Sequence, residues 1–394
     1  MIEYKAQVSS PLASGEAGLT VSDKGLSITT LFEAAEIPFA GINALTIADY
    51  IVTVKADDGD YVFSRMGSWV QPFYNALFDA YNKAVLRSLF IKGDPLLTAK
   101  GTYSFTERNA VGGGSAPIHV YDNNVTVLPP DLSARRVPLC FATGMDQGDF
   151  ELTLRLDSGE SYTYARLGYD SAPFTNAVGR QIRALREKTL AAVREIDPSA
   201  DTAQASKIAA IMPQGAAAAI GRLAGIAPSF VAALESKIAA ARSDGYYSAL
   251  KQLCDPAGIY AGFRKKEAPA ADQDVPDAED AADPYLIWLI APSPDGRYAA
   301  VEFAEADAAT FIYKTYGDFD GFARQLNRAL EAISFRRDVI RMTDEELRKP
   351  ENADYLMAAK RTAALQFVRS GFTGRIIHSG ADTWKRKLTE IWNA

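Results

Sequence analysis

The chain contains a long internal repeat, and this repeat constrains the fold more than any other feature. The following segments return: DYIVTV at 49–54 as DFELTL at 149–154, RMG at 65–67 as RLG at 166–168, and PFYNA at 72–76 as PFTNA at 173–177. The offset is 100 residues before Gly159 and 101 after it. A period of this length indicates a small domain used twice, because solenoid repeats are shorter.

Length and charge limit the classes of protein to consider. With 394 residues, 48% of them hydrophobic, the chain can form several domains with their own cores. Its net charge is −7, and segment 267–283 carries seven acidic residues and no basic one. The remainder is therefore close to neutral and lacks the basic field of a general nucleic-acid binder, so we expect no nucleic-acid partner.

Several features predict a cytoplasmic protein of bacterial type, with the inner membrane surface as an alternative peripheral location. Cys140 and Cys254 follow neither metal-ligand spacing nor a disulfide framework. Residues 1–5 do not resemble a secretory signal, and no apolar run reaches the ~18 residues of a membrane span.

Each copy reads as six or seven short strands followed by one amphipathic helix. In copy one, alternation predicts a strand over 3–8, and turns at 23–25 and 57–60 predict hairpins. Pro38 suits an edge strand or a strand start, and Pro72 suits the first turn of a helix. Copy two shows the same order of signals.

The string IPF…DYIVTV…DG…FSRMG…PF of copy one and its echo in copy two resemble the pleckstrin-homology-like (PH-like) superfold, including its GRAM-type members. The resemblance covers roughly 1–92 and 96–192. It implies a strongly bent sheet closed by a C-terminal helix, and a binding or docking role without catalysis. The first hairpins depart from phosphoinositide-binding members, since copy one has only Lys24 there and copy two has 122–124 without a base.

We therefore predict an α+β fold with two or three PH-like units. The predicted divisions are 1–95 for copy one, 96–196 for copy two, 197–256 for an Ala-rich helical segment, 267–283 for a disordered acidic linker, 257–340 without the linker for a degenerate third unit, and 341–394 for a helical tail. The third unit is suggested by a hairpin at 293–296 and a following helix with apolar periodicity.

Arg65 and Arg166 are candidate binding residues because they occupy the same place in both copies. They either grip a carboxylate or an anionic headgroup, or pair with Asp49 and Asp149 within each copy.

The C-terminal segment supplies the other binding candidates. Trp384 belongs to an apolar stripe on the predicted helix 382–392, beside Lys385, Arg386 and Lys387. Such a stripe either rests at a membrane interface or docks the helix on the preceding unit.

Groups that carry catalysis are sparse. His119 and His378 have no His or Cys neighbour at helical spacing. The segment 112–115 (GGGS) lacks the remainder of a phosphate loop, so we interpret it as a flexible hairpin tip. We expect no catalytic residues, no metal and no cofactor.

The leading hypothesis is a non-enzymatic scaffold or adaptor with a protein or peptide partner. Peripheral membrane binding and an enzyme site assembled between units are the alternatives, and the sequence leaves the oligomeric state open.

Overall fold

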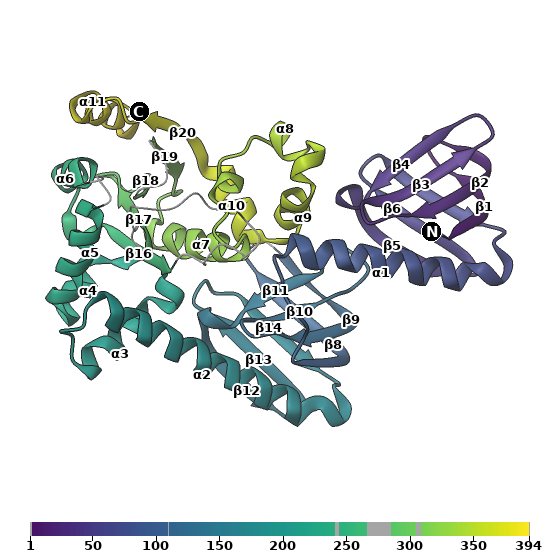
Figure 1. Cartoon of the computed structure of the whole chain (residues 1–394), viewed down its shortest axis with the longest axis horizontal. Helices are drawn as coiled ribbons and strands as arrows, with labels where there is room; N and C mark the ends of the chain where they lie inside the picture. Colours follow the sequence, from purple (N-terminus) through teal and green to yellow (C-terminus); the bar gives the residue numbers. More distant parts are fainter. Residues whose placement is uncertain (1, 109, 241–243, 266–284, 305–308, 394) are drawn as a thin grey trace, which may run out of the picture. The chain divides into compact units, whose positions relative to one another are not determined.

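The computed structural model describes residues 2–108, 110–240, 244–265, 285–304 and 309–393. The fold is α+β with three antiparallel sheets, as predicted (Figure 1). Two compact units are present: Met1–Pro138, Ala142–Val178 and Leu330–Gln366 form the first, and Leu139–Phe141, Gly179–Ala329 and Phe367–Ala394 form the second. The acidic linker predicted at 267–283 lies outside the described residues.

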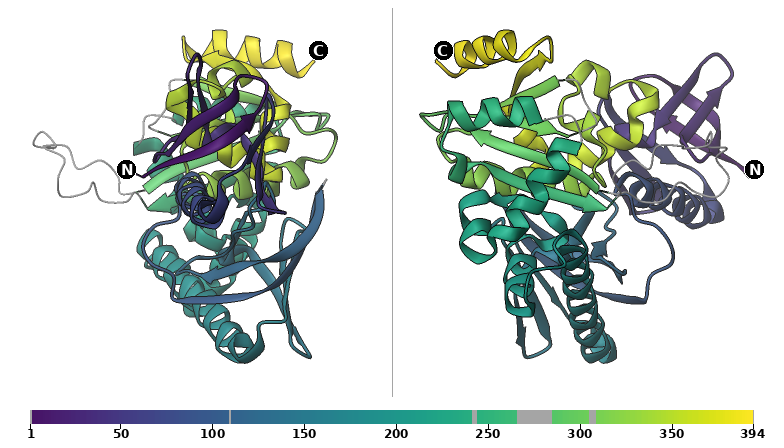
Figure 2. Two further views of the ribbon diagram at one scale, coloured as in Figure 1. Left: turned by 90° about the vertical axis from the view of Figure 1, so that its right-hand side faces the viewer. Right: turned by 60° about the vertical axis from the view of Figure 1, so that its left-hand side comes forward.

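Copy one forms a seven-stranded sheet in the order β4-β3-β2-β1-β7-β6-β5. Its strands are β1 (Glu3–Ser9), β2 (Ser14–Val21), β3 (Gly25–Thr30), β4 (Ala34–Pro38), β5 (Ile42–Ala48), β6 (Ile51–Ala56) and β7 (Gly59–Ser64). Pro38 lies in edge strand β4, as predicted from its missing N–H. Helix α1 (Val70–Ser88) follows and runs along the curled sheet (Figure 2).

Copy two repeats this strand order without a change, as β11-β10-β9-β8-β14-β13-β12. Its strands are β8 (Leu97–Glu107), β9 (Ala110–Val120), β10 (Asn124–Val127), β11 (Arg135–Pro138), β12 (Ala142–Gly148), β13 (Glu151–Leu156) and β14 (Ser161–Ala165). Helix α2 (Ser171–Ile196) follows, as α1 follows in copy one. The repeat seen in the sequence is therefore a repeat of topology.

The same aromatic contact joins sheet and helix in both copies. Phe73 of α1 is fully buried, with ring centroids 5.7 Å from Phe63 and 5.3 Å from Tyr4. In copy two, Phe174 of α2 meets Tyr164 at 5.3 Å. The PF segments of the repeat thus place one phenylalanine of each helix on the inner face of its sheet, which explains their recurrence.

C-terminal helices complete the first unit. Helix α8 (Asp344–Leu347) begins with a capping box between Thr343 and Glu346. Two further helices follow, α9 (Ala353–Arg361) and α10 (Ala363–Gly371), and they are separate because Thr362 between them adopts an extended conformation. Helix α9 is held to copy one by Lys360, whose Nζ lies 2.7 Å from Asp57 Oδ2.

The second unit is built on a six-stranded sheet in the order β15-β16-β17-β18-β19-β20. Its strands are β15 (Ala218–Ala219), β16 (Tyr260–Lys265), β17 (Tyr285–Pro292), β18 (Tyr298–Phe303), β19 (Ala309–Lys314) and β20 (Phe372–Ile377). This simple meander differs from the seven-stranded order of the two copies. Its strands also reach beyond the range 257–340 predicted for a third unit.

The second unit also contains helices. They are α3 (Thr202–Ile211), α4 (Ile220–Ile226), α5 (Pro228–Ala240), α6 (Asp244–Leu253), α7 (Phe319–Ala332) and α11 (Ala381–Trp392), of which α7 ends in the first unit. Many of their buried residues join strands β16–β20 in one core.

The glycines at 112–114 are not a hairpin tip, contrary to expectation. They lie inside β9, where Gly112 pairs with Phe105 and Gly114 pairs with Tyr103. A Cβ at Gly112 would come within 2.6 Å of the Phe105 ring. Gly112 therefore leaves room for the Phe105 ring of β8, which a side chain at this position would displace.

Candidate interaction surfaces

A two-residue hairpin turn connects strands β5 and β6 in copy one, and a matching turn connects β12 and β13 in copy two. Residue pairing runs up to Ala48 with Ile51 in the first hairpin and up to Gly148 with Glu151 in the second. The turn residues are therefore Asp49 with Tyr50, and Asp149 with Phe150.

Both turns expose a large aromatic side chain. Tyr50 is 79% exposed and Phe150 is 78% exposed. Both lie in the left-handed region, with φ of +60° for Tyr50 and +63° for Phe150. A residue with a side chain pays about 1–2 kcal/mol there, whereas Asp-Gly is the preferred pair for such a turn. In the free chain, an aromatic ring at either position gains little from burial.

Arg65 and Arg166 lie beside these turns. The pairing of Val52 with Phe63 places Arg65 across from Tyr50, and the pairing of Glu151 with Ala165 places Arg166 across from Phe150. Both arginines are exposed, and their φ values, +58° and +56°, are also left-handed. Strain of this kind persists where the surrounding structure imposes it and often marks functional positions.

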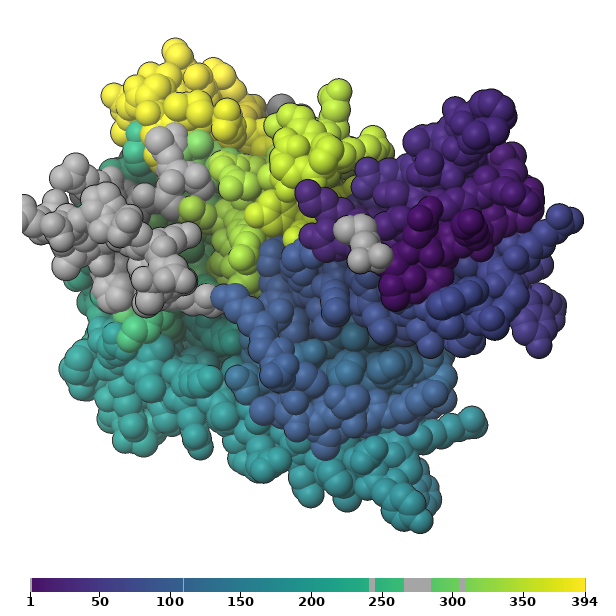
Figure 3. Space-filling view, turned by 45° about the vertical axis from the view of Figure 1, so that its right-hand side comes forward, coloured from purple at the N-terminus to yellow at the C-terminus, as the bar shows by residue number. Residues whose placement is uncertain are grey.

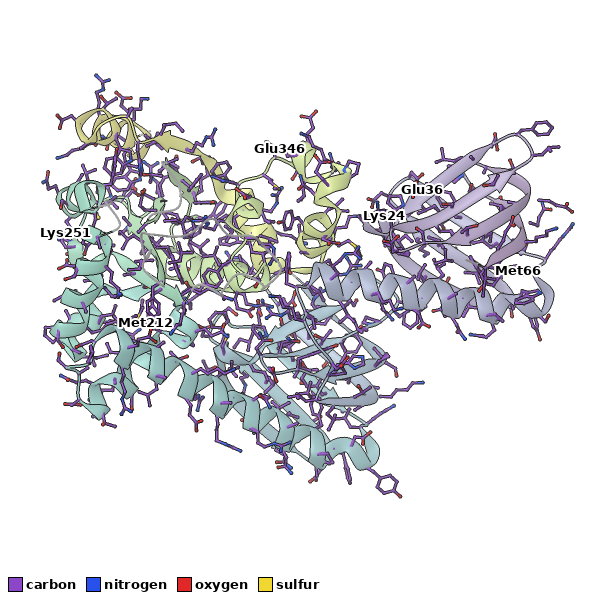
Figure 4. All side chains as sticks on the ribbon, viewed as in Figure 1. Lys24, Glu36, Met66, Met212, Lys251 and Glu346 are labelled. Atoms are coloured by element: carbon purple, nitrogen blue, oxygen red, sulfur yellow. The ribbon has the colours of Figure 1, made fainter. Side chains whose placement is uncertain are left out.

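The predicted pairing of these arginines with aspartates is not observed. Within the described ranges, neither Arg65 nor Arg166 has an ion-pair partner within 4.0 Å, and both side chains are exposed. Figure 4 labels the next residue, Met66, where β7 meets the start of α1. The short 3₁₀ turn that follows exposes a further aromatic residue in each copy, Trp69 and Tyr169.

We call these two regions the sheet-end surfaces. They consist of Asp49, Tyr50, Arg65 and Trp69 in copy one, and of Asp149, Phe150, Arg166 and Tyr169 in copy two. Each combines two exposed rings with one guanidinium and one carboxylate. The rings can enter a hydrophobic pocket, and the guanidinium can pair with a carboxylate of a bound protein.

The C-terminal candidates lie in the second unit, and the structure separates their roles. Trp384 is fully buried, and its Nε1 donates a hydrogen bond to Thr310 Oγ1 at 2.7 Å. The remaining apolar stripe joins the same core. Lys385 donates to Gln252 at 2.8 Å, while Arg386 and Lys387 are exposed. Of the four, Trp384 therefore serves packing in this conformation.

The two histidines belong to different units. His119 accepts or donates a hydrogen bond with Thr98 Oγ1 at 2.9 Å, and burial lowers its pKa. His378 stacks on Tyr246, with ring centroids 3.7 Å apart, and its Nε2 lies 3.0 Å from Oε1 of the buried Glu302.

Among the residues that the structure describes, no group of three or more His, Cys, Asp or Glu side chains is arranged to hold a metal ion. Burial, with a smaller contribution from Asp255, raises the pKa of Cys254 to about 11. The thiol of Cys254 is therefore protonated at neutral pH and poorly nucleophilic.

The exposed aromatics were missed by the sequence interpretation, although a signal was present. The repeat places Tyr50 and Phe150 after an aspartate, between two strands, where glycine is the usual residue. An aromatic at the glycine position of a tight turn, retained in both copies, is a local conflict of the kind that marks a functional site.

Comparisons with known proteins add little. No family model matches this chain, and no curated protein matches it. Among solved structures, "Structure of the Spt16D Pob3N heterodimer" is similar over 44% of this chain and 87% of that one, with 11% identity and a TM-score of 0.17. A similarity this low carries no argument about function. In the described part of the chain, every helix is too short or too polar to cross a membrane.

Proposed function

We propose that this chain is a non-catalytic adaptor built on two tandem PH-like domains, and that it binds a protein or peptide through its sheet-end surfaces. The observation that carries the proposal is the recurrence of a strained, exposed aromatic beside a strained, exposed arginine. Tyr50 with Arg65 and Phe150 with Arg166 are matched in position, exposure and backbone conformation. A shared strand order and a closing helix support the PH-like interpretation.

The cost of these residues favours a binding role. Each aromatic carries about 1–2 kcal/mol of backbone strain and gains almost nothing from burial in the free chain. A bound partner would remove the exposed rings from water and recover part of this cost. Exposed Tyr, Trp and Arg side chains are also the types that dominate binding energy at protein interfaces.

Charge favours a protein partner over an anionic membrane. Each sheet-end surface has one arginine and one aspartate, and copy two adds the exposed Glu151 next to Phe150. These surfaces are neutral or acidic, whereas binding to anionic lipid needs clustered basic residues. A peptide with a hydrophobic side chain near a carboxylate fits this pattern of charge.

A displayed peptide library selected on the full chain tests the proposal. Selected peptides should contain a hydrophobic residue next to an acidic one. The double variant Tyr50→Ala with Phe150→Ala should weaken binding of the selected peptides by at least about tenfold, the usual loss at an interface hot spot.

A matched control distinguishes binding at this site from nonspecific hydrophobic binding. Val111 is as exposed as Tyr50 but lies on strand β9, so Val111→Ala should leave peptide binding unchanged. Peptides that bind the double alanine variant as well as the parent would refute the proposal. So would failure to select any peptide combined with binding to anionic vesicles.

A further inference from the structure

A connection of copy two docks on an edge strand of copy one. The connection between β10 and β11 spans 128–134. The backbone N–H of Leu45 in β5 donates to Pro130 O at 2.7 Å, and Ala44 forms a β-bridge with Asp131. Leu128 and Ala134 are buried in the core cluster of copy one. Figure 3 shows the surface of the copy-one strands in purple.

The strand of copy two that corresponds to β5 exposes the equivalent position. Leu45 and Met145 occupy the same place, each just after the same irregularity at the start of the edge strand. Leu45 is 1% exposed, but Met145 is 40% exposed. The N–H of Leu45 points away from β6, because it donates to Pro130 O. By equivalence, the N–H of Met145 in β12 points away from β13 and is an open hydrogen-bond donor.

The connection of copy one that corresponds to 128–134 is exposed too. It is the β3–β4 turn, where Leu31 is 85% exposed and Phe32 is 90% exposed. Thr30 rigidifies the turn, since its Oγ1 accepts hydrogen bonds from Phe32 N at 3.3 Å and Glu33 N at 2.9 Å. Two adjacent large apolar side chains are therefore presented to solvent in an ordered turn, which usually marks an interaction site.

We propose that this chain associates head to tail with a second copy of itself. The β3–β4 turn of one chain docks on the β12 edge of the next, as 128–134 docks on β5 within a chain. The two contact surfaces are different, so the interface is heterologous and each chain keeps one free turn and one free edge. Growth can then continue into a ring or a filament.

Self-association leaves the sheet-end surfaces accessible. Tyr50 remains 79% exposed although the neighbouring strand β5 is covered by 128–134. By equivalence, Phe150 stays exposed when β12 is covered. The head-to-tail contact therefore does not depend on the proposed adaptor function, and it would array the sheet-end surfaces of successive chains for multivalent binding.

Sedimentation velocity of the full chain tests the proposal. The contact is small, so we expect a dissociation constant on the order of 100 µM, with association visible between about 10 and 500 µM. The wild-type chain should shift from its 42.7 kDa monomer to larger species as concentration rises. The double variant Leu31→Ser with Phe32→Ser removes the apolar side chains of the turn. Met145→Pro removes the backbone donor at the β12 edge, which is not one of the hydrogen bonds between β12 and β13.

Mixing the two variants provides the decisive measurement. Each variant alone should remain monomeric, because it lacks one of the two surfaces. An equimolar mixture should form heterodimers and nothing larger, because only one intact turn and one intact edge can meet. Met145→Glu is a second edge variant that keeps the backbone donor and adds charge opposite the acidic Glu33 and Glu36. It should weaken association at least tenfold, and it serves as a control if the proline variant misfolds.

Three outcomes would overturn the proposal. One is a wild-type chain that stays monomeric across the whole concentration range. Another is a dimer that survives both single-surface variants, which would indicate a different interface. The last is a mixture of folded variants that shows no heterodimer.

Discussion

Replacing the exposed turn aromatics by glycine should stabilise the chain while it abolishes partner binding. Glycine removes about 1–2 kcal/mol of left-handed strain at Tyr50 or Phe150 and costs about 0.4–1 kcal/mol through the greater freedom of the unfolded chain. The net gain is about 0.5–1 kcal/mol at each turn. Little burial is lost, because both rings are exposed in the free protein.

Alanine is the matched control, because it removes the ring but keeps the strain. The double glycine variant should therefore exceed the double alanine variant in stability by about 1–2 kcal/mol, since the two turns are separate and their effects add. Both double variants should lose peptide binding to the same extent. Stability and binding would then move independently, which a purely structural role for the rings does not predict.

Thermal unfolding followed by circular dichroism, with hydrogen exchange over 42–56 and 142–156, measures the effect. At about 2–4 °C per kcal/mol for a domain of this size, the midpoint of the double glycine variant should lie a few degrees above that of the alanine variant. Amides of both hairpins should exchange more slowly. If the glycine variant is no more stable than the alanine variant, the argument from backbone strain is wrong.

Three further predictions concern single side chains. Trp384→Phe should cost about 1–3 kcal/mol through loss of its hydrogen bond to Thr310, and Trp384→Ala about 3–5 kcal/mol, as measured by urea unfolding. In a Cys140→Ser background, Cys254 should react with iodoacetamide at pH 8 about 100-fold more slowly in the native chain than in urea, because burial raises its pKa to about 11; equal rates would contradict this. The folded chain holds the pKa of His119 below its ordinary 6.5, so the unfolded chain binds more protons there, and stability should fall as the pH drops from about 6.5 toward that lower pKa. Proton NMR of the His119 ring checks the direction, and a midpoint above 6.5 would contradict it.

Local signals in the sequence were sufficient for most of the fold. Alternation and turn residues located most of the strands, and Pro38 and Thr343 behave as their backbone chemistry requires. The repeat also placed Arg65 and Arg166 in equivalent positions. Strands β5 and β12 were overlooked, because their polar and small residues carry little alternation of their own, and pairing with β6 and β13 defines them.

Contacts between residues far apart in the sequence determined the remaining features of the fold. The break at Thr362 divides one apolar period into two helices, and the glycines at 112–114 belong to a ladder because aromatic rings from β8 cross them. The sequence by itself determined that one module occurs twice, with a run of short strands, a closing helix and matched arginines. Only the tertiary structure decided that Leu45 is covered while Met145 is exposed, because the burial of an edge strand depends on what another part of the chain brings against it.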